Sequence, residues 1–507
     1  MAAQTQPAFG LKPPTSLSLC SEFAKFISSS WLKIVVLSAV ALVPCFWHRE
    51  IAAGDLGSHL YNAWLAQLIE RGQISGLKIA SQWNNVLFDW LLAGLGKTFS
   101  LYAAEKIAVA MAVLIFFWGT FAFTWALAGR VSWSAVPCLL MLTYGWTFAA
   151  GFFNYYLSLG LSFCALAIFL KGKGWERAGA LAFVPFVILA HPLGLVWMIG
   201  AAIYIATAER MSAWAQIALT GAGACALVLV RVYLQAHFRI GEILLLDRPL
   251  YNGADQLILY GTPYWALAAA FVGLLFAVLI ADARQRGLEA AWAHYRLTIL
   301  LYMLVEAAVL LMPDSIGVSS YQAPVGYVTA RLTSISAVLI CCLIAAARPK
   351  TWQAAGFSAI AIGFFGLLYM DTNKINHLEE QVSELVRSVP ANVRILSTIR
   401  EPRHWRISRA HLLDRACIGH CFSYGTYEPT TGQFRVRVER PNPYQLMEHD
   451  AMLRMETGKY VLKTEDLPAY QLYECDNGSS ELCLHELSAG EMNNTVATKG
   501  LRDLKRP

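Results

Sequence analysis

Apolar residues in this sequence are grouped in blocks of 14 to 22 residues, which are separated by short charged segments. A helix of about 20 apolar residues spans the hydrocarbon core of a bilayer, whereas the strands of a soluble core need much shorter runs. The blocks predict a mainly α fold, a polytopic bundle of about eleven transmembrane helices. The expected spans are residues 34–47, 107–128, 132–149, 153–170, 176–190, 193–208, 213–233, 262–281, 297–312, 333–347 and 352–370.

The N-terminal segment and one short apolar run are treated separately. Residues 1–33 are polar, and no small-residue cleavage site follows the run 34–47. We therefore expect that run to be a retained anchor rather than a signal peptide. Residues 86–95 are apolar, but Asp89 interrupts them and Lys97 flanks them, so we expect them to lie outside the bilayer.

The composition agrees with a membrane protein. Hydrophobic residues make up 57% of the 507 residues and charged residues 15%, against about 45–50% and about 25% in soluble domains, and the mean hydropathy is +0.46. This excludes a soluble enzyme, a nucleic-acid-binding module and a disordered scaffold for the main body. The net charge of +6 comes from basic residues at membrane ends, where they report topology, so no nucleic acid partner is expected.

The distribution of Lys and Arg predicts the orientation, because cytoplasmic joints are enriched in these residues. With a cytoplasmic N-terminus, the short inner joints hold ten basic residues and the short outer joints hold three. We expect an integral protein of a bacterial inner (plasma) membrane with three parts: a cytoplasmic segment (1–33), a transmembrane domain (34–370) and an extracytoplasmic, periplasmic domain (371–507). The first extracytoplasmic loop, 48–106, is expected to carry helices that lie on the membrane surface.

The C-terminal part, 371–507, is rich in charge and predicts an α+β soluble domain. Apolar residues recur at helical spacing within 373–389, which indicates a short helix that leads out of the membrane. Residues 433–439 alternate between apolar and polar side chains, as is typical of a strand with one face in water.

Four of the eleven cysteines, Cys417, Cys421, Cys475 and Cys483, lie in this domain. An extracytoplasmic compartment is oxidising, so two disulfides are expected. Two alternatives stay open: four free thiols, or a metal site formed by Cys417, His420 and Cys421. The other seven cysteines lie in or next to the spans, where we expect them to act as small apolar side chains.

The first outer loop opens with an acid and an imidazole four residues apart. Asp55 stands where a helix N-cap is expected, and Leu60, Trp64 and Leu68 mark one apolar face of the helix that follows. His59 then lies on the same face as Asp55. Either Asp55 is only a helix cap and His59 an interfacial residue, or the two form a site just outside the membrane.

Further polar residues are expected at the same membrane face. Asn154 and His191 lie in outer turns, and Arg331 begins the span that follows Tyr321. With the acid and imidazole of the first loop, they supply a carboxylate, imidazoles, an amide and a fixed cation. These groups are suited to a phosphate-linked substrate at a membrane surface.

Glu306 is the one carboxylate well inside an expected span. Ionisable groups in the bilayer are candidates for functional sites, so Glu306 is included among the substrate-binding residues. The alternative is a structural ion pair with Arg231, which also lies near an outer span end.

The layout resembles the GT-C superfamily of polytopic glycosyltransferases, which includes protein mannosyltransferases and lipid A aminoarabinose transferases. The shared features are the single anchor, the outer loop with an early Asp55 followed by His59 and the helix Tyr61-Asn62-Ala63, and the outer turn His191-Pro192. The resemblance covers residues 30–370. It implies transfer of a sugar from a polyprenyl-phosphate donor to an extracytoplasmic envelope glycan, lipid or protein acceptor, with Asp55 as the catalytic base.

The same resemblance leaves two points open. A second acidic residue is common in the family, and Asp89, Glu242, Asp247 and Asp314 all qualify by position, since Asp55 itself has no acidic neighbour. Some relatives hold the donor phosphates through a divalent metal (Mg or Mn), and the sequence has no dense acidic cluster that requires one.

The implied chemistry fits the residue types. The donor already carries a good leaving group, so the enzyme must position an acceptor hydroxyl or amine and accept its proton, which Asp55 would do with His59 tuning its charge. Arg331 would stabilise the charge that grows on the lipid phosphate. The alternatives are a polysaccharide polymerase or ligase, and a non-catalytic membrane protein or transporter.

Overall fold

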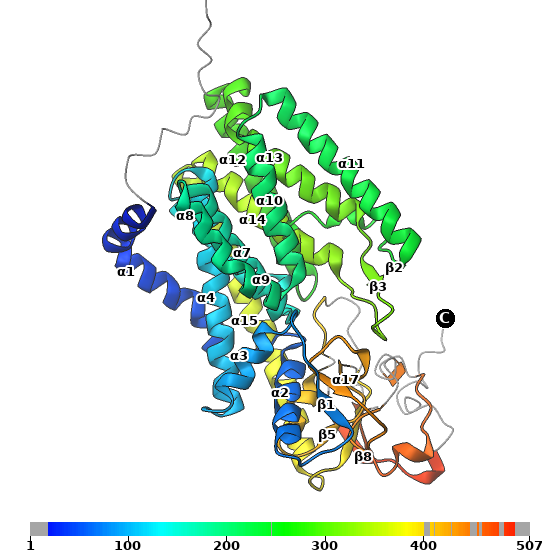
Figure 1. Cartoon of the computed structure of the whole chain (residues 1–507). Coiled ribbons are helices and arrows are strands. Elements are labelled where there is room, and N and C mark those ends of the chain that lie inside the picture. The colour runs from blue at the N-terminus through cyan, green and yellow to red at the C-terminus, as the bar shows by residue number, and fades with distance from the viewer. Residues whose placement is uncertain are drawn as a thin grey trace, which may run out of the picture.

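The computed structural model is a long helical bundle with a smaller mixed domain at one end (Figure 1). Helices make up most of the first three quarters of the chain, and the short strands of the end domain come mostly from its last quarter. The structure describes residues 19–244, 246–399, 406–409, 411–426, 428–446, 454–455, 459–475 and 481–491.

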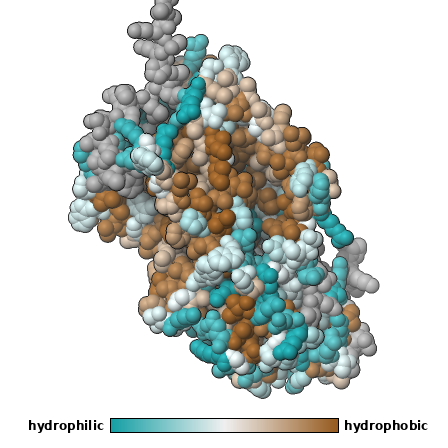
Figure 2. All heavy atoms as spheres, viewed as in Figure 1, coloured by the Kyte–Doolittle hydropathy of each residue, from teal (hydrophilic) through white to brown (hydrophobic). Residues whose placement is uncertain are grey.

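Eight helices among the described residues are long and apolar enough to cross a membrane. A helix satisfies its own peptide groups, which is why apolar runs take this form in hydrocarbon. The chain is therefore an integral membrane protein, and Figure 2 shows hydrophobic surface over the bundle. The eight are α1 (Leu19–Phe46), α4 (Leu101–Ala128), α7 (Phe153–Lys171), α11 (Ala213–His237), α12 (Thr262–Arg286), α13 (Leu288–Leu311), α14 (Val328–Ala347) and α15 (Thr351–Arg387).

The remaining expected spans differ from the prediction. The runs 132–149 and 176–190 are not continuous helices, because prolines start α5 and α9, and Gly145 separates α5 from α6. The run 193–208 forms a helix of 17 residues, at the short end of what spans a bilayer. These pieces are η1 (Trp133–Ala135), α5 (Val136–Thr143), α6 (Trp146–Ala149), α8 (Trp175–Ala178), η2 (Gly179–Phe183), α9 (Val184–Ala190) and α10 (Pro192–Ala208).

The last long helix, α15, joins two segments that the sequence predicted separately. It has 37 residues, or about 55 Å at 1.5 Å per residue, against a hydrocarbon core of about 30 Å. The short helix expected at 373–389 is therefore the continuation of the span expected at 352–370. This helix carries the chain directly from the bundle into the end domain (Figure 1).

Close contact between α4 and α7 fixes the centre of the bundle. A Cβ added at Gly119 would lie 2.3 Å from the carbonyl oxygen of Gly160, so the two backbones approach as closely as glycine allows. On the other side of α7, a Cβ at Gly194 would lie 2.1 Å from the hydroxyl of Ser158, which fixes α10. These contacts position the N-terminal ends of α7 and α10.

The end domain combines the first loop with the C-terminal part of the chain. Strand β1 (Leu77–Ile79) pairs antiparallel with β6 (Val436–Val438), which confirms the core of the strand expected at 433–439. A four-stranded sheet has the order β5-β4-β7-β8, in which β4 is parallel to β5 and β7. The domain contains α2 (Leu56–Glu70), α3 (Leu87–Leu95), β4 (Arg394–Ser397), α16 (Leu412–Cys417), β5 (Phe422–Ser423), α17 (Glu428–Thr431), η5 (Thr464–Asp466), β7 (Tyr470–Glu474), β8 (Leu482–Glu486) and η6 (Ala489–Glu491).

Short elements complete the loops of the bundle. As expected, residues 86–95 do not form a span, because α3 has nine residues. Between α11 and α14, two strands pair antiparallel, with Ile240 opposite Ile316. These loop elements are β2 (Arg239–Gly241), η3 (Arg248–Leu250), η4 (Ala254–Leu257) and β3 (Ser315–Gly317).

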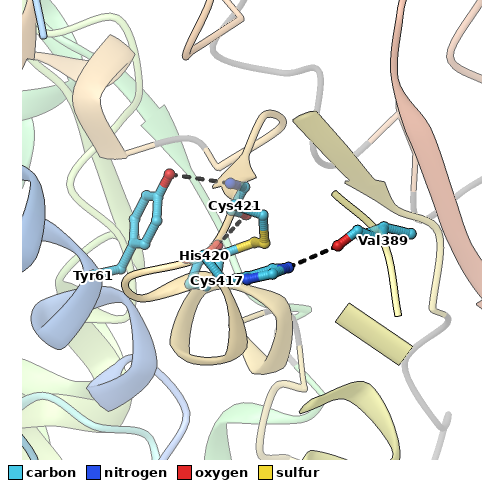
Figure 3. Close-up of a disulfide and its surroundings, with 7 residues drawn as sticks. Tyr61, Val389, Cys417, His420 and Cys421 are labelled. Carbon is cyan, nitrogen blue, oxygen red and sulfur yellow. Dashed lines mark hydrogen bonds between the residues drawn. A yellow bond between two sulfur atoms is a disulfide. The ribbon is translucent and has the colours of Figure 1, made fainter. Parts of the chain in front are cut away.

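Both expected disulfides are present, Cys417–Cys421 and Cys475–Cys483. The alternative metal site is wrong, because Cys417 and Cys421 are bonded to each other. His420 instead makes a hydrogen bond of 2.9 Å between its Nε2 atom and the carbonyl oxygen of Val389 (Figure 3).

Arg415 on α16 ties the end domain to the bundle. Its guanidinium lies 3.0 Å from the carboxylate of Glu50, 3.1 Å from Glu105 on α4 and 3.7 Å from Glu379 on α15. Burial lowers the pKa of Arg415, but the three carboxylates outweigh burial and raise it. The end domain is thus held to two long helices by buried charge.

Candidate functional site

A cavity of about 740 Å³ lies between the bundle and the end domain. Its walls come from the start of α2, the turn before α7, the turn between α9 and α10, the first turn of α14 and the segment before α16. Six of the seven residues that the sequence singled out line it: Asp55, His59, Asn154, His191, Tyr321 and Arg331.

Asp55 is held in the cavity wall by its backbone. It is the N-cap of α2, but its side chain makes no capping hydrogen bond. Its amide donates to the carbonyl of Ala150 at 3.0 Å, and the neighbouring Gly54 amide donates to Ala149 at 2.8 Å. Gly151 has φ +84°, and a Cβ there would lie 2.4 Å from the Asp55 nitrogen, so only glycine fits. The carboxylate is therefore spared from capping and lines the cavity.

His59 is oriented by an acid of the same loop. Its Nδ1 atom lies 2.8 Å from a carboxylate oxygen of Asp89, whose other oxygen accepts from Asn154 at 2.9 Å. Asn154 also accepts from the amide of Phe88 at 2.7 Å, which fixes α3 against α7. Burial lowers the pKa of His59, but Asp89 outweighs it and the pKa rises to about 9. His59 is therefore cationic at neutral pH.

His411, from the end domain, is the residue that sequence reasoning missed. Its Nδ1 atom lies 2.7 Å from Asp414, and its Nε2 atom lies 3.8 Å from a carboxylate oxygen of Asp55. Asp414 is fixed in turn by the hydroxyls of Ser423 and Thr426. Burial lowers the pKa of His411, but Asp414 and Asp55 raise it to about 9. The spacing of His411 and Asp414 was visible in the sequence, but nothing there connects it with Asp55.

Sequence reasoning also missed Glu428 of α17, an acid that interacts electrostatically with both His59 and His411. Its carboxylate accepts a hydrogen bond from the side chain of Asn62 on α2. Burial raises the pKa of Glu428 to about 7, and the positive charges of His59 and His411 limit the rise. This acid links the polar groups of α2 with the end domain.

Arg331, in the first turn of α14, contributes a cation to the cavity. Its guanidinium stacks over Phe152, with 4.4 Å to the ring centroid, and lies 5.9 Å from the ring of Tyr155. The hydroxyl of Tyr155 donates to the backbone carbonyl of Arg331 at 2.6 Å. His191, whose ring contacts Tyr155 edge-on at 5.3 Å, accepts from the amide of Leu193 and caps α10. The guanidinium is therefore positioned by the aromatic rings of Phe152, the N-cap of α7, and of Tyr155 in its first turn.

The seventh predicted residue, Glu306, does not line the cavity. Its carboxylate accepts a hydrogen bond of 2.5 Å from Ser336 on α14. The proposed ion pair of Glu306 with Arg231 is wrong, because Arg231 pairs with Glu242 at 2.8 Å.

The four candidates for a second acid differ in their position relative to the cavity. Asp89 stands one hydrogen bond behind the cavity, through His59. Glu242, Asp247 and Asp314 do not line the cavity. Of the four acids that the sequence left open, Asp89 is the one whose carboxylate bonds predicted site residues, His59 and Asn154, whereas Asp314 meets the cavity residue Val328 through its backbone carbonyl.

The cavity holds more positive than negative groups. Burial raises the pKa of Asp55, and the cations of His411, His59 and Arg331 oppose that rise. A divalent metal does not fit this arrangement, because the part of the chain described by the structure places no three His, Cys, Asp or Glu side chains around one point.

No protein-family model, curated protein or solved structure matches this chain. The function is therefore argued from the cavity itself.

Proposed function

We propose that this protein is a membrane glycosyltransferase that moves a sugar from a polyprenyl-phosphate donor to an extracytoplasmic acceptor. The observation that carries the proposal is that a carboxylate and a guanidinium from distant segments, Asp55 and Arg331, line one cavity between the bundle and the end domain. A base and a fixed cation in one enclosed space are what the transfer requires.

The reaction is a single displacement. The acceptor oxygen or nitrogen attacks the anomeric carbon, the bond between that carbon and the phosphate oxygen breaks, and its electron pair stays on the phosphate. Asp55 takes the proton that the acceptor loses. Arg331 binds the phosphate oxygens, where negative charge grows. Attack opposite the leaving group inverts the anomeric centre.

The walls of the cavity support a lipid-linked donor. Leu193 and Val196 on α10 line it, and Val196 is largely exposed, so an apolar chain has a path from the bilayer side. On the other side, Asn84 and Gln433 supply amide groups suited to hydroxyls. The cavity thus offers apolar surface toward the bundle and hydrogen-bonding groups toward the end domain.

The orientation also belongs to this proposal. Two disulfides in the end domain favour an oxidising compartment, in agreement with the excess of Lys and Arg in the predicted inner joints. The cavity would then open outside the cytoplasm, where a polyprenyl-phosphate carrier presents its sugar to envelope acceptors.

The test is complementation of a deletion strain, read by mass spectrometry of lipid-linked sugars and envelope glycans. Wild-type protein should restore the missing transfer, and Asp55→Asn should lower it by about 10²- to 10⁴-fold, as expected for loss of a general base. Asp247→Asn is the matched control, because Asp247 is exposed and lies outside the cavity.

Two results would contradict the proposal. One is full restoration by Asp55→Asn when it is present in the membrane at wild-type level. The other is a deletion strain whose lipid-linked sugars and glycans are both unchanged. Accumulation of a long preassembled glycan on its carrier, rather than of a monosaccharide carrier, would favour the polymerase or ligase alternative.

A further inference from the structure

His411 reaches the cavity from the end domain and faces the carboxylate of the proposed base. The Nε2 atom of His411 is 3.8 Å from Asp55, while its Nδ1 atom is held by Asp414 at 2.7 Å. Both His411 and Asp414 are buried, and His411 lines the cavity that Asp55 also lines. The imidazole therefore bridges two carboxylates, one buried in the end domain and one at the cavity.

We propose that His411 is a positioning residue that acts through Asp55: its imidazolium, held by Asp414, keeps the Asp55 carboxylate ionised for the incoming acceptor. The role in transfer rests on the function proposed above, whereas the effect on the ionisation of Asp55 does not. The C-terminal domain would then complete the site rather than only cover it.

The charges around Asp55 determine the sign of the effect. Burial raises the pKa of Asp55, and His411 is the strongest of the opposing positive charges. The groups whose charges act on Asp55 are the cations His411, His59 and Arg331 and the acids Asp414 and Glu428. Removing the cation at 411 leaves burial less opposed, so the carboxylate should then hold its proton to a higher pH.

His59 is less suited to this role, although it belongs to the same helix as Asp55. Its Nδ1 atom is bonded to Asp89, and its influence on Asp55 is smaller than that of His411. A second contact supports His411: a Cβ added at Gly57 would lie 2.5 Å from the carbonyl oxygen of residue 411. The first turn of α2 therefore packs directly on the backbone that carries this histidine.

The test follows the protonation of Asp55 without using transferase activity. Dicyclohexylcarbodiimide reacts with protonated carboxyl groups, so its labelling of Asp55, measured by mass spectrometry of the full-length protein in detergent, reports the midpoint of titration. His411→Gln should move this midpoint upward by about one pH unit or more. His420→Gln is the matched control, since His420 is in the same domain, bonds Val389 and lies outside the cavity.

A further variant keeps the result interpretable. His411→Lys restores a positive charge and should return the midpoint toward the wild-type value. Thermal unfolding identifies a variant that has lost its fold, and the remaining variants then decide.

The inference is overturned if folded His411→Gln protein labels with the wild-type midpoint. It is also overturned if His411→Lys behaves like His411→Gln. These failures are distinct from failure of the proposed function. In that case Asp55→Asn still supports transfer, while the labelling midpoint still responds to residue 411.

Discussion

The imidazole of His411 lies 3.8 Å from the carboxylate of Asp55, and this contact joins the C-terminal domain to the loop between α1 and α4. Neither residue alone marks a site, because an N-cap Asp and a buried His are common in ordinary folds. Their approach at the wall of a cavity that Arg331 also lines supports a site with separate proton-accepting and phosphate-binding ends.

Replacing Arg331 should affect transfer more than it affects folding. Arg331→Gln removes the cation at the leaving phosphate, and we expect a loss of about 10²- to 10³-fold in kcat. Arg331→Lys should lose less, because it keeps the charge but not the planar stack on Phe152. Transfer to extracted acceptor with purified protein measures both. Equal activity of wild type and Arg331→Gln would exclude Arg331 from the reaction.

Gly151→Ala should displace Asp55. The left-handed backbone at residue 151 and the distance of 2.4 Å from an added Cβ to the Asp55 nitrogen both oppose the substitution. We expect a loss of about 1 kcal/mol or more in unfolding free energy and a fall in transfer of up to about a hundredfold. Gly273→Ala on α12 is the control, since a Cβ there meets nothing within 4 Å. Similar behaviour of the two variants would refute the tight fit.

Stability should fall as pH rises from about 5 to about 9. The pKa of Glu428 is raised from 4.5 to about 7, so the folded state holds its proton longer than the unfolded state and loses that advantage as pH rises through 7. The pKa of His411 is raised from 6.5 to about 9, so its stabilisation is complete below 6.5 and is lost as pH rises through 9. Thermal unfolding in detergent across this range measures the slope. Glu428→Gln should flatten its lower half and His411→Gln its upper half; unaltered slopes would contradict the buried network.

Labelling of single cysteines in whole cells tests the proposed orientation. In a variant whose exposed Cys225 is replaced by serine, Lys78→Cys on β1 should react with a membrane-impermeant maleimide, because residue 78 is half exposed on the end domain. Arg284 lies in the last turn of α12, on the predicted cytoplasmic side. Arg284→Cys should therefore react only after the cells are opened. The reverse pattern would place the cavity in the cytoplasm.

The sequence predicted much of the cavity, because counting basic residues in the joints assigns a side of the membrane to every turn. Asp55, Asn154, His191 and Arg331 were grouped in this way, and they do line one cavity. The grouping required each apolar run to be counted as one crossing. It did not require each run to be a single helix, and the runs around α5 and α9 are built from shorter helices.

The rest of the site could not be predicted, because it depends on tertiary contacts that leave no periodic signal. Asp414 and Glu428 become partners of the histidines only when the end domain folds against α2. The prediction for Glu306 was wrong for a related reason. Burial of a carboxylate inside a span predicts only that it has a polar partner, and here that partner is Ser336 rather than a group in the cavity.

The ion cluster of Arg415 has a consequence for any attempt to isolate a minimal membrane core. Truncating the chain after α15 would leave the carboxylates of Glu50, Glu105 and Glu379 close together without the guanidinium that they share. Their mutual repulsion would then destabilise the surface against which the missing domain docks. Bundle and tail should therefore be expressed and purified together.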